Sequence, residues 1–105
     1  MRVLLLDEAE RELLDAIRWY DDQQTGLGHD FEQEVFKVVD RIRQNPLLGS
    51  LVEVLPDCDD VRRMAAHRFP YHVIYDCSGL PDEVRVFAVA HERRRPDYWL
   101  DRLGG

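Results

Sequence analysis

The sequence predicts an α+β fold in which a helical hairpin packs on a mainly antiparallel sheet. Two amphipathic helical stretches occupy the first half of the chain, and three strand-like stretches occupy the second half. A short apolar stretch at residues 2–6 adds a strand at the start. We therefore expect the order β-α-α-β-β-β with a short helix at the end, in a single domain of residues 1–105.

The first helix is expected to follow the initial strand directly. Asp7, with Glu10 three residues later, predicts a capping box at its start. Helical spacing predicts a buried face made of Leu13, Ile17 and Tyr20. The outer face is expected to hold the polar side chains Arg11, Glu12, Asp15 and Arg18. Gly26 and Gly28 predict that the helix ends just before them.

The second helix completes the predicted hairpin. Its expected buried face is apolar at helical spacing and consists of Phe31, Val35, Val38, Val39 and Ile42. Asn45-Pro46 predicts its end, because a residue before proline is disfavoured in the helical conformation. Two amphipathic helices joined by a glycine-containing turn form an antiparallel pair, which should cover one face of the sheet.

The sheet is expected to come mainly from the second half of the chain. An acidic loop at residues 47–60, with an extended piece at 51–55, precedes strands predicted at residues 61–67, 69–77 and 83–90. A turn at residues 78–82 makes the last two strands a hairpin. The sheet face away from the helices should be partly open, and the candidates to line it are Arg63, His72 and His91.

The last strand and the residues after it are the expected working end of the protein. The strand alternates between two mostly apolar sets, Val84, Val86, Ala88 and Ala90 against Arg85, Phe87, Val89 and His91. This pattern is typical of a strand near the middle of a sheet. Arg93-Arg94-Arg95 follows the strand, and Pro96 predicts the start of a short helix with Tyr98, Trp99 and Leu103. Basic and aromatic groups held by a buried strand suit a binding surface.

Composition and charge limit the class of protein. The net charge of −7 argues against binding nucleic acid by bulk electrostatics, which requires neutralising phosphates. The charge is uneven: residues 1–59 hold 6 Lys+Arg against 14 Asp+Glu, and residues 60–105 hold 8 against 7. Cys58, Cys77 and the four histidines lack metal-ligand spacing, so we expect no metal or cofactor. We also expect no export signal or membrane span and a cytoplasmic location.

Several stretches together resemble the RelE/ParE superfamily of bacterial toxins from type II toxin–antitoxin systems. The matching pieces are Trp19-Tyr20, Gly26-Leu27-Gly28 with Phe31, Asn45-Pro46, Arg68-Phe69-Pro70-Tyr71, Val73-Ile74-Tyr75, and Val89-Ala90-His91 with Arg93, Arg94, Pro96, Tyr98 and Trp99. They keep their order over nearly the whole chain. The resemblance implies a β-α-α-β-β-β sheet-and-hairpin fold and a cognate antitoxin that neutralises the toxin.

The superfamily divides by target. RelE-like members cut mRNA in the ribosome without a metal, by means of basic side chains that stabilise charge on the phosphate. That pattern falls here on Arg63, Ala65, His72, Glu92 and Tyr98, so a glutamate stands where an arginine belongs, although a shift of one residue would place Arg93 there instead. ParE-like members inhibit DNA gyrase by binding, which needs anchors rather than a catalytic set. The resemblance therefore favours the ParE, or plasmid-stabilisation, branch.

The predicted target-binding residues are Arg93, Arg94, Tyr98 and Trp99. DNA gyrase is the expected target, and we expect no membrane partner and no sequence-specific DNA binding by this chain alone. One alternative is a ribosome-dependent mRNA endonuclease with the substituted catalytic set Arg63, His72, His91 and Tyr98. A second alternative is a toxin fold that has lost toxicity and only binds its antitoxin. The arginine run also has a purely structural interpretation, as a solvated end of the strand.

Overall fold

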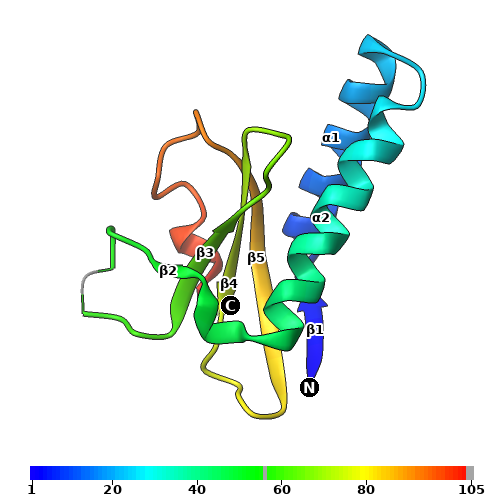
Figure 1. The fold of residues 1–105 in the computed structure, drawn as a ribbon. Helices are drawn as coiled ribbons and strands as arrows, with labels where there is room; N and C mark the ends of the chain where they lie inside the picture. The colour runs from blue at the N-terminus through cyan, green and yellow to red at the C-terminus, as the bar shows by residue number, and fades with distance from the viewer. Residues whose placement is uncertain (56, 104–105) are drawn as a thin grey trace.

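The computed structural model describes residues 1–55 and 57–103, which form a five-stranded sheet with a helical hairpin along one side (Figure 1). The elements are β1 (Arg2–Leu5), α1 (Asp7–Gln23), α2 (Leu27–Gln44), β2 (Ser50–Leu51), β3 (Val61–Ala65), β4 (Tyr71–Asp76) and β5 (Glu83–His91). Two short 3-10 helices complete the described chain: η1 (Pro46–Leu48) precedes β2, and η2 (Leu100–Arg102) follows β5 near the C-terminus. The predicted α+β class and the order of the two helices and four main strands are confirmed. Residue 56 of the predicted loop and residues 104–105 of the predicted domain lie outside the described residues.

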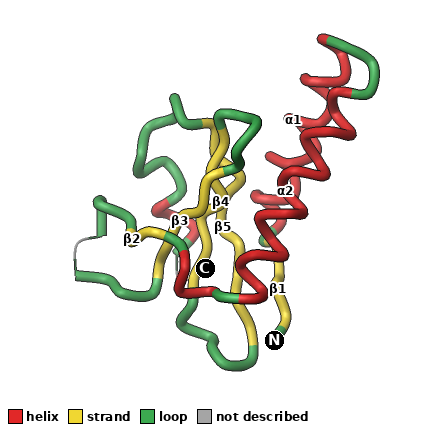
Figure 2. The backbone as a smooth tube through the Cα atoms, in the orientation of Figure 1, coloured by secondary structure: helices red, strands yellow, loops and turns green. Residues whose placement is uncertain are grey.

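The sheet has the strand order β1-β5-β4-β3-β2 (Figure 2). β1 pairs with β5 in parallel, and the other neighbours are antiparallel. β5 therefore has a strand on each side along its first half, as its apolar sequence predicts. β2 is only two residues long and replaces the longer extended piece predicted at 51–55, because residues 53–55 turn away from β3.

The face of the sheet under the helices is closed by a cluster of aromatic rings. Phe31 of α2 lies with its ring centroid 5.2 Å from that of Phe69 and 4.9 Å from that of Tyr71. Tyr20 of α1 packs against the same rings, 5.1 Å from Phe31 and 4.8 Å from Phe69. Edge-to-face pairs of this kind add to the burial of apolar surface. Of the Trp19-Tyr20 pair, Tyr20 packs as expected, whereas the Trp19 side chain is 57% exposed.

Two glycines determine how closely the helices approach. Gly26 has φ of 91°, a left-handed conformation that residues with a Cβ rarely adopt, and it ends the turn between the helices. Gly28 lies inside α2, where a Cβ atom would collide with the backbone carbonyl oxygen of Ile17 on α1. The predicted break at these glycines is confirmed, and Gly28 also sets the contact distance of the two helices.

The opposite face of the sheet is covered by irregular chain. Trp99, 2% exposed, packs with a second group of buried residues: Val52, Val61, Ile74, Phe87, Ala88 and Ala90. The cover comes from the loop after β2 and from residues 96–103, which Figure 1 draws in orange to red on the side of the sheet away from the hairpin. The expectation of a partly open face holds only at one end, where Arg63 and His72 lie beside a pocket.

A β-bulge changes the predicted alternation along β5. Ile74 pairs with Ala88 and Tyr75 pairs with Val86, so Phe87 is an extra residue in its strand. Val84 and Val86 face the helices, while Ala88 and Ala90 face the second core. The prediction that these four residues share one face is wrong, because the extra residue reverses the side of each residue that follows.

The start of α1 and the segment after β5 also differ from the prediction. α1 begins one residue earlier than a capping box requires: the Glu10 N–H donates to the Leu6 carbonyl at 2.9 Å, and Leu6 has no side-chain cap within the described chain. Asp7, Glu8 and Glu10 instead favour the helix by placing negative charge in its first turn. Residues 96–103 form turns and η2 rather than an α-helix, since the Leu100 and Arg102 N–H groups bond three residues back.

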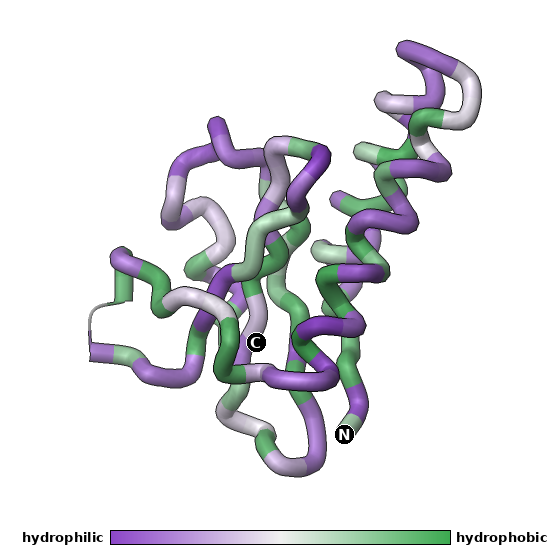
Figure 3. Tube along the Cα trace, in the orientation of Figure 1, coloured by the Kyte–Doolittle hydropathy of each residue, from purple (hydrophilic) through white to green (hydrophobic). Residues whose placement is uncertain are grey.

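The hydropathy of the residues agrees with a sheet buried between two covers. In Figure 3 green, apolar segments occur in β4 and β5, and green and purple segments alternate along both helices. Both helices carry charged side chains along their length. Over the residues that the structure describes, neither helix is long and apolar enough to cross a bilayer.

Candidate functional site

The three arginines form an exposed turn at the end of β5, which we call the tip (residues 92–95). Backbone bonds hold the turn on the sheet: the Glu92 N–H donates to the Pro70 carbonyl at 2.8 Å and the Arg94 N–H to the His91 carbonyl at 3.0 Å. The Arg93 N–H donates to Nδ1 of His91 at 3.0 Å. The three arginine side chains are exposed. The backbone of the tip is thus fixed while its arginine side chains remain exposed.

The predicted target-binding residues separate into surface and core. Arg93 and Arg94 are exposed, and Tyr98 is half-buried. Trp99 is buried, and its ring fills the second core. In this conformation Trp99 is 2% exposed and offers almost no surface to a partner.

Tyr98 connects the tip to the first helix. The Arg94 guanidinium lies over the Tyr98 ring, 4.0 Å from its centroid. The Tyr98 hydroxyl donates to Oε2 of Glu12 at 2.6 Å. Burial, reinforced by this hydrogen bond and the charge of Glu12, raises the pKa of Tyr98 above its usual range. The phenol therefore stays a protonated donor.

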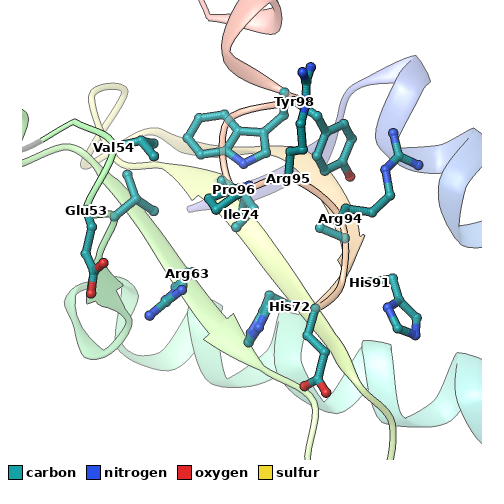
Figure 4. A pocket seen from close by; sticks show the side chains of 14 residues that line it. Glu53, Val54, Arg63, His72, Ile74, His91, Arg94, Arg95, Pro96 and Tyr98 are labelled. Atoms are coloured by element: carbon teal, nitrogen blue, oxygen red, sulfur yellow. The ribbon is translucent and has the colours of Figure 1, made fainter.

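Beside the tip lies a pocket of about 200 Å³ (Figure 4). Its lining comes from β3, β4, the loop after β2, the tip and the C-terminal segment: Val52, Glu53, Val54, Arg63, His72, Ile74, Ala90, His91, Glu92, Arg94, Arg95, Pro96, Tyr98 and Trp99. All four residues of the predicted nuclease set, Arg63, His72, His91 and Tyr98, contribute to this lining.

The orientation of the two histidines differs. In Figure 4 the His72 side chain lies beside Arg63, whereas the His91 ring points away from both. The His91 ring makes an edge contact with Tyr71, with centroids 5.1 Å apart. The structure therefore brings Arg63 and His72 together and directs His91 toward the helical side. The bulge at Phe87 is the cause, because it reverses the end of β5.

His72 is a neutral histidine at the edge of the core. Burial lowers its pKa, the positive charge of Arg63 lowers it further, and Glu92 acts in the opposite direction. Its Nδ1 is buried and has no hydrogen-bond partner in the described chain. A neutral imidazole can accept a proton, so this group has the chemistry of a general base.

Two carboxylates share the pocket. Glu53 and Glu92 both lie in its lining, opposite in charge to the arginines. Negative groups at this position oppose the build-up of charge on a phosphate, which a metal-independent nuclease must stabilise. The pocket thus combines a neutral histidine with an unfavourable electrostatic environment for phosphate cleavage.

Glu12 and Arg102 belong to the site and were not predicted as part of it. Arg102 pairs with Glu12 at 2.9 Å, with side chains 16% and 18% exposed. Burial lowers the pKa of Arg102, but the hydrogen bond and charge of Glu12 raise it by more. The sequence pattern places Glu12 on the outer face of α1, and this prediction is wrong. The position of Glu12, three residues after Ala9 and four before Ala16, could have indicated its orientation, because both alanines are buried on the same side of α1.

A helical hairpin packed on a five-stranded mixed sheet is the architecture of the RelE/ParE-like toxins. Within that class the chain belongs to the ParE toxin family of type II toxin–antitoxin systems. The sequence model of this family, described as ParE toxin of type II toxin-antitoxin system, parDE, matches residues 3–96. Among curated proteins, none matches the chain.

A solved structure shows the same fold. The chain resembles one from the chromosomal ParDE toxin–antitoxin system of P. aeruginosa, with a TM-score of 0.70 over 87% of this chain and 95% of that one. The two sequences are 15% identical. The likeness therefore concerns the path of the backbone, and the residues of the site must be interpreted from this chain itself.

Proposed function

We propose that this ParE-family toxin stops growth by binding DNA gyrase through its tip. The main support is the exposed Arg93 and Arg94 on a backbone that His91 and Pro70 fix. Arginine is favoured at binding surfaces because its planar group makes several directed hydrogen bonds. Trp99 contributes through its packing in the second core rather than by contact with the target. A gyrase-binding toxin acts in the cytoplasm.

Gyrase assays on matched arginine variants test this proposal. Arg93→Ala with Arg94→Ala should weaken inhibition of supercoiling at least about tenfold, since hot-spot arginines each contribute roughly 2 kcal/mol or more. Arg43→Ala is the control, because Arg43 is exposed on α2 and pairs with Asp40 at 2.6 Å, away from the tip. Ribosome-dependent cleavage of mRNA with unaffected gyrase would overturn the proposal. A chain that fails to stop growth would point to the non-toxic, antitoxin-binding alternative.

A second candidate is the ribosome-dependent mRNA endonuclease. The observation in its favour is that Arg63, neutral His72 and Tyr98 line one pocket. His72 would accept the 2′-hydroxyl proton, and Arg63 would stabilise the phosphate. The carboxylates of Glu53 and Glu92 count against it.

Histidine substitutions separate the two candidates. His72→Ala together with His91→Ala should abolish a nuclease, whereas a binder should lose only part of its activity. Primer extension on translated mRNA, run beside the supercoiling assay, provides both readouts on the same preparations.

We also propose that a cognate antitoxin neutralises the toxin by binding the acidic helical half. Exposed acids of α1, such as Glu8 and Asp15, lie on the same helix as exposed Leu14 and Trp19. A basic and apolar antitoxin segment complements that surface. If charge steers the association, its rate should fall as salt rises, and a rate independent of salt would contradict this part of the proposal.

A further inference from the structure

The carboxylate of Glu12 joins three parts of the chain. It accepts the Val89 N–H of β5 at 3.1 Å and the Tyr98 hydroxyl at 2.6 Å. The Arg102 guanidinium donates to both of its oxygens, at 2.9 and 3.3 Å. One side chain on α1 thus holds the last strand and the C-terminal segment, at sequence separations of 77, 86 and 90 residues.

This arrangement takes the place of a missing strand. β1 pairs with β5 only from Glu83 to Val86, and the Leu6 N–H donates to the Val86 carbonyl as the chain turns into α1. Beyond that point the described residues place no strand on this side of β5. Glu12 accepts the Val89 N–H there, and Arg102 donates to the Phe87 carbonyl at 2.8 Å. The ion pair therefore satisfies edge groups that would otherwise need water or another strand.

The same ion pair reaches the tip through one aromatic ring. Arg102 and Arg94 both lie over the ring of Tyr98, 5.2 and 4.0 Å from its centroid. The hydroxyl group of Tyr98 donates its hydrogen bond to Glu12. Because Glu12 holds its hydroxyl and Arg102 lies over its ring, Tyr98 presents Arg94 with a ring of fixed orientation.

We propose that Glu12 is a positioning residue for the tip: it fixes Tyr98 and Arg102, and through Tyr98 it fixes the Arg94 guanidinium in its binding orientation. The effect on gyrase rests on the proposed function. The ordering of residues 94–102 does not, so it can be measured separately.

The test compares Glu12→Gln with Glu10→Gln. Both changes remove one negative charge from α1, but Glu10 is exposed and outside the Glu12 contacts. The amide introduced by Glu12→Gln keeps one acceptor oxygen and presents an N–H₂ group to donors, which leaves Arg102 without its charge partner. We expect amide hydrogen exchange in residues 98–102 to accelerate at least about tenfold in Glu12→Gln, while the slowest amides of α2 keep their rates. In Glu10→Gln both sets should be unchanged.

Gyrase affinity supplies the second readout, at a temperature where both variants are folded. Glu12→Gln should weaken gyrase inhibition at least about tenfold, and Glu10→Gln should not. Tyr98→Phe keeps the ring under Arg94 but removes its hydroxyl donor, so its effect should be smaller. Combined with Glu12→Gln it should add little, because both changes break the same bond.

The outcomes are separable. Unchanged exchange at residues 98–102 in Glu12→Gln would overturn the positioning role, and so would faster exchange with unchanged gyrase inhibition. If the unmodified protein does not inhibit gyrase, the proposed function fails. The NMR signal of the Arg94 side-chain Nε–H then decides the positioning role: loss of its order only in Glu12→Gln supports it, and unchanged order overturns it.

Discussion

The two faces of the sheet are closed in different ways. On one face a helical hairpin covers a continuous core, in which Phe31 meets rings from α1 and from the start of β4. On the other face Trp99 lies at the centre of a smaller core under irregular chain. The C-terminal part of that cover is held by hydrogen bonds that Tyr98 and Arg102 donate to Glu12, in place of helical packing.

The helical face contributes most to the stability of the fold, whereas the opposite face holds the residues proposed to act. A helix pair buries its face through many residues spread over several turns, so its packing defines the fold. The irregular cover depends on a few contacts, and it also holds the tip and the pocket. We therefore expect substitutions on the helical face to change global stability, and those on the opposite face to change local order and binding.

The largest expected effect comes from Phe31→Ala. Phe31 is fully buried, and its loss leaves a cavity among three other rings, so the free energy of unfolding should fall by about 3–5 kcal/mol. Urea denaturation measures this change. Phe36→Ala on the same helix, where the side chain is 47% exposed, should cost less than about 0.5 kcal/mol. Equal losses for the two would contradict a core centred on Phe31.

Trp99→Ala tests whether the second face is a separate unit. It removes the largest buried side chain of that face, and we expect the free energy of local opening of residues 96–103 to fall by about 3 kcal/mol. Native-state hydrogen exchange should show lost protection in residues 96–103 while α2 keeps its slow amides. Loss of protection across the whole sheet would show that the two faces open together.

How far the sequence predicts the molecule depends on which face is considered. The helices, their buried sides and the breaks at Gly26 and Asn45 follow from spacing and from the backbone preferences of glycine and proline. The same local rules fail for the second face. The bulge at Phe87 adds no unusual residue to β5, so its alternation looks regular until the pairing with β4 is known.

The site is predictable only in part for a related reason. The arginine run of residues 93–95 is visible directly in the sequence. Trp99 is expected at the surface beside it, but a tryptophan next to exposed arginines can lie inward, and the direction depends on the cover over the sheet. Glu12 escapes prediction because its partners lie 77 or more residues away.

Gly28→Ala tests how closely the two helices must approach on the helical side. A methyl group here would meet the Ile17 carbonyl oxygen, so the helices must separate. Overpacking of this kind costs about 1–3 kcal/mol, which thermal unfolding would detect as a lower Tm. Gly79→Ala, in the exposed turn before β5, is the comparison away from the helix pair, since the three atoms nearest to its Cβ would all belong to Glu83. A Tm unchanged by Gly28→Ala would show that the helix pair tolerates a wider spacing.

The smallest expected effect is the pH dependence that His72 gives to the open end of the second face. Its pKa is lowered in the folded protein by burial and by Arg63, so folding favours the neutral form. The resulting stability is present above the unfolded pKa of about 6.5 and is lost as the pH falls below it. His72→Gln should therefore lose less stability than the unmodified protein between about pH 7.5 and about pH 5. Parallel losses in urea denaturation would show that His72 does not carry this dependence.

The single extra residue in β5 has a consequence for how this protein can vary in length. Removing Phe87 would turn residues 88–91 over, sending Ala88 and Ala90 toward the hairpin and the His91 ring toward His72. A deletion of one codon would thus exchange the side chains that face the hairpin with those that face the second core, at the strand end that supports the arginines. The number of residues before the tip constrains this protein as firmly as their chemical nature.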